Sequence, residues 1–99
     1  MIERPLAIAR DHPAFDGHFP GRPILPAVVL LAEALAAIEH DTGTRTRDWS
    51  VSQVKFVQAV EPGASLTLAY ELTDGGSARF EVRAGSGLVA HGTLAPAAA

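Results

Sequence analysis

The chain contains no cysteine among its 99 residues. This excludes disulfide bridges, thiolate nucleophiles and zinc sites built from cysteine. It also lacks an apolar run of the roughly 20 residues that a bilayer-spanning helix needs, because the longest run, Ile24 to Ala32, ends at Glu33. The N-terminus shows no positive segment followed by an apolar one, which a signal peptide would require. We therefore expect a cytoplasmic protein with no membrane span.

A basic surface is missing as well. The net charge is −3, and no stripe of lysine and arginine offsets the repulsion from phosphate groups, which argues against a nucleic-acid partner. A content of 47% hydrophobic and 19% charged residues excludes a disordered chain. We expect a single domain over residues 1–99. Because so small a domain has much surface for its core, the high apolar content indicates that some residues face a partner subunit.

The first half of the sequence predicts one strand, one loop and one helix. Leu6–Ala9 is apolar enough for a short strand, and the loop from Asp11 to Pro26 is stiffened by four prolines. Pro26 suits the first turn of a helix, which we expect to run to His40 and to end near Gly43. The side chains expected to face the core recur at helical spacing: Val28, Leu31, Leu35 and Ile38.

After residue 43 the hydrophobic period changes from 3.6 to 2, which predicts strands. A slip in the alternation near Ser52 indicates a β-bulge, Asp74-Gly75-Gly76 indicates a hairpin turn, and Pro62-Gly63 is expected to turn one strand into the next. One helix covers an antiparallel sheet of this size only if the sheet curls around it, so we expect an α+β fold with a wrapped central helix. The predicted strands are Trp49–Val57, Leu66–Leu72, Ala78–Arg83 and Leu88–Leu94.

The most informative segment is Gly17 to Pro26, which reads Gly-His-Phe-Pro-Gly-Arg-Pro-Ile-Leu-Pro. It resembles the active-site loop of the hot-dog-fold 3-hydroxyacyl-acyl-carrier-protein dehydratases of fatty-acid synthesis. It is more similar still to their smaller relatives in aryl-polyene and related pigment pathways. The helix after the motif, Lys55-Phe56 and Glu61-Pro62-Gly63 extend the resemblance more weakly along the chain.

This resemblance implies a dehydration in which a 3-hydroxyacyl thioester on acyl carrier protein becomes the trans-2-enoyl thioester, without metal or other cofactor. His18 would remove the C2 proton, a helix carboxylic acid would help the C3 hydroxyl to leave, and the amides of Ala27 and Val28 would hold the thioester oxygen. The resemblance also places Phe19 and Gly21 at the substrate, with Phe19 in either the pocket wall or the core. Arg22 and Lys55 would contact the phosphopantetheine phosphate or an acidic carrier, although both also read as ordinary surface charge.

The residues support this chemistry on general grounds. A weakly acidic C2 proton needs a base with a pKa near neutrality, and the developing enolate charge needs aimed donors, which a helix N-terminus supplies. Outside the motif, His18 alone would be read as a loop histidine with one structural hydrogen bond. His12, His40 and His91 have no such context, and the spacing of the histidines with Asp11 and Asp16 matches no metal-ligand pattern.

Two positions depart from the family pattern. The family's helix acid lies fourteen residues after the loop histidine, which is Ala32 here, and glycine is usual at Ala27. Glu33 follows Ala32, but one helical step rotates a side chain by about 100°, toward the side of Ala37 and His40. Glu33 is therefore either a shifted acid or a solvent-facing carboxylate. A designed inactivation of the acid position is a third interpretation.

Two other functions remain open. The missing acid is typical of a non-catalytic hot-dog subunit that binds acyl chains or stabilises an active related dehydratase. A thioesterase on the same fold is the second alternative, although thioesterase sites in this fold usually centre on a carboxylate rather than a histidine. The partners implied are acyl carrier protein and a second hot-dog subunit, in a homodimer or, with a chain that retains its helix acid, in a heterodimer.

Overall fold

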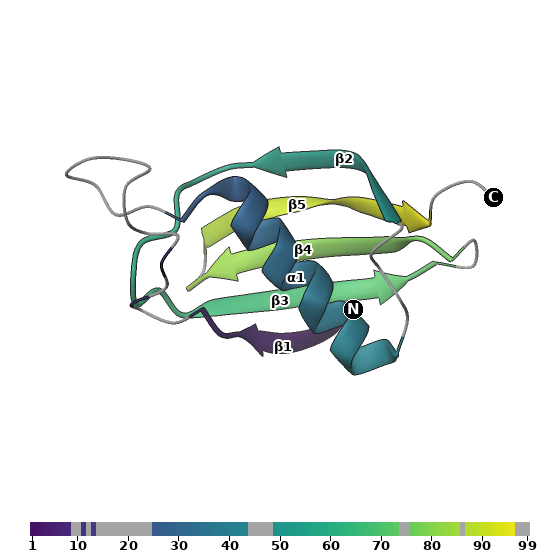
Figure 1. Ribbon diagram of the computed structural model, residues 1–99, viewed down its shortest axis with the longest axis horizontal. Coiled ribbons are helices and arrows are strands. Elements are labelled where there is room, and N and C mark those ends of the chain that lie inside the picture. Colours follow the sequence, from purple (N-terminus) through teal and green to yellow (C-terminus); the bar gives the residue numbers. More distant parts are fainter. Residues whose placement is uncertain are drawn as a thin grey trace.

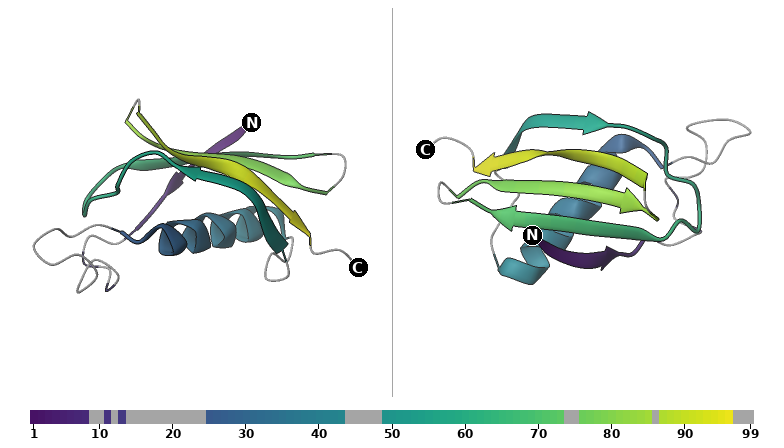
Figure 2. Two further views of the ribbon diagram at one scale, coloured as in Figure 1. Left: turned by 90° about the horizontal axis from the view of Figure 1, so that it is seen from above. Right: turned by 180° about the vertical axis from the view of Figure 1, so that it is seen from behind.

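The computed structural model describes residues 1–8, 11, 13, 25–43, 49–73, 76–85 and 87–96. Its elements are β1 (Ile2–Leu6), α1 (Ala27–Thr42), β2 (Trp49–Phe56), β3 (Leu66–Leu72), β4 (Ala78–Ala84) and β5 (Gly87–Pro96). The strands form one antiparallel sheet in the order β1-β3-β4-β5-β2. Helix α1 lies along one face of the sheet, which arches over it (Figure 1 and Figure 2). The expected arrangement of one helix wrapped by an antiparallel sheet is therefore present. Within the described ranges no helix is long and apolar enough to cross a membrane.

Helix α1 has the boundaries that its terminal residues predict. Pro26 is the N-cap residue, with φ of −59° and ψ of 142°. Gly43 ends the helix in the left-handed conformation at φ of 74°, and its N–H donates to the Glu39 carbonyl at 2.8 Å. Such a left-handed glycine satisfies a carbonyl of the last turn. The helix extends two residues past His40, the end expected from the sequence.

The helix face that meets the sheet differs from the predicted stripe. Leu30, Ala34, Ala37 and Ile38 are buried, whereas Val28 is 74% exposed and Leu31 and Leu35 are only half-buried. The prediction was right for Ile38 and wrong for Val28, because it weighted the larger side chains. Two alanines on the buried face allow the helix backbone to lie close to the sheet, and this close packing stabilises the fold.

Strand β1 begins earlier than expected, at Ile2 rather than Leu6, and pairs with β3. Strand β1 contains Pro5, which lacks a backbone donor. Since β1 is an edge strand, proline is tolerated there.

The expected meander is confirmed for β3, β4 and β5 but not for β2. Strand β2 pairs with β5 and lies at the opposite edge of the sheet from β1. Pro62 and Gly63 do form a turn, in which the Ala64 N–H donates to the Glu61 carbonyl at 3.2 Å and Gly63 has φ of 83°. This turn leads the chain across the end of the sheet rather than into a neighbouring strand. The prediction failed because β5, last in the sequence, pairs between β4 and β2.

A β-bulge interrupts the pairing of β2 with β5, as the slipped alternation predicted. The register shifts between Val51 and Gln53. Just beyond the bulge, Gly92 pairs with Val54, and an added Cβ at Gly92 would collide with the Gln53 carbonyl oxygen and with Val54. Glycine inside a strand commonly marks such a close backbone approach. The sequence therefore needs glycine here to hold β2 against β5.

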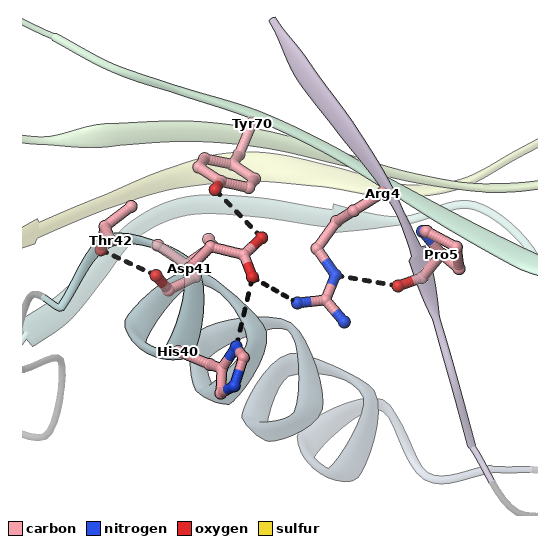
Figure 3. Close-up of polar contacts among 7 residues, drawn as sticks. Arg4, Pro5, His40, Asp41, Thr42 and Tyr70 are labelled. Carbon is pink, nitrogen blue, oxygen red and sulfur yellow. Dashed lines mark hydrogen bonds and ion pairs between the residues drawn. The ribbon is translucent and has the colours of Figure 1, made fainter.

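The C-terminal end of α1 is tied to the sheet by Asp41 (Figure 3). Its carboxylate accepts a hydrogen bond from Arg4 Nη1 of β1 at 2.7 Å and from the hydroxyl of buried Tyr70 in β3 at 3.1 Å. Burial raises the pKa of Asp41, but hydrogen bonds from His40, Tyr70 and Arg4 outweigh it and hold the pKa below its usual value. The carboxylate thus joins the helix to two strands.

Candidate active site

The N-terminal end of α1 carries backbone donors that no described residue satisfies. The Pro26 carbonyl accepts hydrogen bonds from the N–H groups of Val29 at 3.0 Å and Leu30 at 3.2 Å. No side chain of the described residues caps this end, and the first turn has no acidic residue. Within the described part of the chain, no acceptor meets the N–H groups of Ala27 and Val28. Two free amides at the positive end of a helix dipole suit a developing negative charge.

These donors border an apolar cleft of about 350 Å³. One wall is the helix start, with Ala27 and Leu30, and the other is the end of β2 and the segment that follows it. Hydrogen bonds hold the second wall in place: the Val57 N–H donates to the Val89 carbonyl at 2.7 Å, and the Leu25 N–H donates to the Val60 carbonyl at 2.9 Å. A helix N-terminus that opens on an apolar cleft can hold a polar reacting group with an apolar chain beside it.

The sequence-predicted site residues divide into two groups. His18, Phe19, Gly21 and Arg22 lie outside the described residues. Ala27 lines the cleft, and Val28 is exposed beside it. The structure thus brings together the two predicted amide donors.

Lys55 lies apart from this cleft. It stands opposite His91 in the β2–β5 pairing and lines a hollow that it shares with Arg79 and Glu81. Because successive side chains of a strand point to opposite faces, Lys55 lies on the other face of β2 from Phe56, which lines the cleft.

Glu33 and Ala32 occupy other sides of the helix. Glu33 lines a hollow of about 270 Å³ toward β1, together with Ala37 and His40, as its helical position predicted. Six residues at about 100° each place Glu33 about 120° around the helix from Ala27. Ala32 is exposed. Neither Glu33 nor Ala32 is among the described residues that line the cleft.

Sequence reasoning missed the second wall of the cleft, formed by Phe56 to Val60. Phe56 was noted as part of a strand, but nothing in the local sequence places this strand end beside the helix start. The placement depends on long-range hydrogen bonds from the Val60 and Val89 carbonyls.

Comparison with known proteins agrees with this arrangement. The sequence model of the ApeI-like family, described as ApeI dehydratase, matches residues 1–93. The chain belongs to the ApeI-like dehydratase family. It is 38% identical over 98 residues to the 3-hydroxyacyl-[acyl-carrier-protein] dehydratase FabZ of Chlamydia trachomatis, covering 85% of this chain and 63% of that enzyme. The chain therefore spans less than two thirds of the length of this relative.

Solved structures agree on the fold. The dehydratase heterocomplex ApeI:P from Xenorhabdus doucetiae matches with a TM-score of 0.76 at 22% identity, over 97% of this chain and 86% of that one. A point mutant of the fluoroacetyl-CoA-specific thioesterase FlK matches with a TM-score of 0.69 at 14% identity, over 95% of this chain and 84% of that one. The expected hot-dog fold is confirmed, and so is the resemblance to the dehydratase family near its aryl-polyene members.

Proposed function

We propose that this member of the ApeI-like family is a subunit of a dehydratase that converts a 3-hydroxyacyl thioester on acyl carrier protein into the trans-2-enoyl thioester and water. The observation that carries the proposal is the pair of amides at Ala27 and Val28, which no described acceptor meets, beside an apolar cleft. The 38% identity to an enzyme of that name supports the reaction type. The pathway we propose is fatty-acid or aryl-polyene synthesis.

The proposed mechanism assigns the first step to His18. Its imidazole removes the proton from C2, and the electron pair moves toward the thioester carbonyl. The Ala27 and Val28 N–H groups stabilise the negative charge that develops on the carbonyl oxygen. The charge then returns to form the C2–C3 double bond as the C3–O bond breaks. The departing hydroxyl takes up a proton from an acid and leaves as water.

The source of that acid is the open question of the site. Ala32, at the family's acid position, has no proton to donate. Glu33 is the nearest carboxylate in sequence, but it lies toward β1 while the cleft lies toward β2. This separation favours an acid supplied by a partner subunit over a shifted acid from Glu33.

An exposed edge suits such a partner. Among the described strands, β2 pairs only with β5. It carries exposed apolar side chains at Val51 and Phe56 and is followed by exposed Val57; Phe56 and Val57 line the cleft. Exposed edges and apolar patches commonly mark sites of association. We propose a dimer through this edge, in which His18 faces the helix acid of a related chain. A homodimer would instead contain two sites without the acid at position 32.

Two other functions are separated by the product formed. A non-catalytic subunit would yield no product by itself, and it is favoured by Ala32. A thioesterase would yield a free acid, and a hot-dog thioesterase is among the structures of similar fold. The deciding experiment incubates a 3-hydroxyacyl-carrier protein with the purified chain, alone and with an acid-bearing relative, and follows the carrier by mass spectrometry. Loss of water supports the dehydratase, whereas release of the acyl group or an unchanged carrier contradicts it.

A further inference from the structure

One polar side chain stands in the apolar cleft beside the helix start. Among the described residues that line it, Gln58 alone has a side chain that both donates and accepts hydrogen bonds. Its neighbours on that wall are Phe56, Val57 and Val60, and Leu30 faces them from the helix. Gln58 is exposed to solvent, and a polar group among the apolar residues that line a cleft can fix the orientation of a ligand.

The backbone at Gln58 is held against β5 by hydrogen bonds. The N–H groups of Val57 and Gln58 both point at the Val89 carbonyl, at 2.7 and 3.4 Å. The Gln58 side chain passes over Gly87, where an added Cβ would stand 3.1 Å from Nε2. Glycine at position 87 therefore leaves room for the carboxamide in its present place.

The chemistry of the cleft indicates which part of a substrate meets this carboxamide. No charged side chain lines the cleft among the described residues, so a phosphate group has no counter-charge there. The thioester oxygen belongs at the amides of Ala27 and Val28. The glutamine carboxamide offers two N–H donors and one carbonyl acceptor, so it can donate to the carbonyl of one secondary amide and accept from the N–H of another. The phosphopantetheine arm of a carrier-bound thioester contains such amides next to its sulfur.

We infer that Gln58 is a substrate-binding residue that holds an amide of the phosphopantetheine arm, an inference that rests on the proposed function. In the bound state the Gln58 carboxamide exchanges hydrogen bonds with the arm, while the thioester oxygen lies at the helix start. Gln58 thereby selects thioesters carried on pantetheine over simple alkyl thioesters.

The test measures binding, so it is independent of turnover. Two unreactive probes are titrated by calorimetry: an alkyl pantetheine thioether and a matched thioether in which methylene groups replace the amides. Gln58→Leu is expected to weaken binding of the pantetheine probe about tenfold, the worth of one to two buried hydrogen bonds. Its affinity for the amide-free probe should equal that of the wild type, as expected when a residue and a substrate group interact directly.

Two variants serve as controls. Gln53→Leu makes the same change on β2, outside the cleft lining, and should leave both affinities unchanged. Gly87→Ala should displace the Gln58 carboxamide and weaken binding of the pantetheine probe. Added to Gln58→Leu, it should cause no further loss of affinity for that probe. Equal loss for both probes in Gln58→Leu, or no binding of either probe to the wild type, overturns the inference. Normal probe binding without dehydration would instead count against the proposed function alone.

Discussion

Gly92 offers the sharpest test of how β2 is held in the sheet. In Gly92→Ala the new Cβ meets the Gln53 carbonyl oxygen and the Val54 Cα, both backbone atoms, and the Val54 Cγ2. Backbone atoms cannot rotate away as a side chain does, so β2 has to shift. Overpacking of this kind costs about 1–3 kcal/mol, and replacing glycine returns about 0.4–1 kcal/mol by restricting the unfolded chain. The expected net loss is about 1–2 kcal/mol.

A loss of this size lowers the melting temperature of a domain of about 100 residues by about 5–15 °C. The assay is thermal and urea unfolding followed by circular dichroism, at equal protein concentration because association also affects stability. Gly87→Ala is the matched control on the same strand. Its Cβ meets chiefly the flexible end of Gln58, so its melting temperature should stay within about 3 °C of the wild type. If Gly92→Ala is as stable as Gly87→Ala, the close approach of β2 does not explain the glycine.

Four further predictions concern the helix and the glycine that ends it. Asp41 has a lowered pKa, so its contribution to stability is full at neutral pH and is lost as the pH falls below about 4. Urea titrations of Asp41→Asn should therefore show a smaller loss of stability in acid than those of the wild type. An equal dependence of stability on pH in the two proteins would refute this. Gly43→Ala forces a left-handed conformation on alanine and should cost about 1 kcal/mol in the same assay, whereas a neutral effect would contradict the observed cap. Glu33→Gln should change the turnover of an active pair of this chain and an acid-bearing relative by less than a few-fold. A loss of 10²–10⁴-fold would instead identify Glu33 as the acid. Ala32→Asp should create or raise dehydratase activity in the chain alone.

Local sequence signals predicted the local structure well. Pro26 and Gly43 marked the ends of the helix, and the alternation of β3 and β4 gave their boundaries. The slip near Ser52 located the bulge. Each of these features depends on a residue's own backbone preference or on its immediate neighbours.

Features that depend on distant contacts were not predictable. The place of β2 depends on β5, the last strand in the sequence, which pairs between β4 and β2. The buried face of α1 is decided by how closely Ala34 and Ala37 let it approach the sheet. For the same reason the sequence identified the Ala27 end of the site but not the wall that carries Gln58, which is brought there by Val89 and Val60.

The central claim is that this chain contributes the catalytic base of a dehydratase site. The most direct measurement co-expresses the chain with a related subunit that keeps its helix acid, and follows water loss from a 3-hydroxyacyl-carrier protein by mass spectrometry. His18→Ala in this chain should abolish the dehydration that depends on it, with the pair still assembled and its melting temperature unchanged. Full activity of the His18→Ala pair, together with an essential histidine in the partner, would contradict the account and leave this chain a structural subunit.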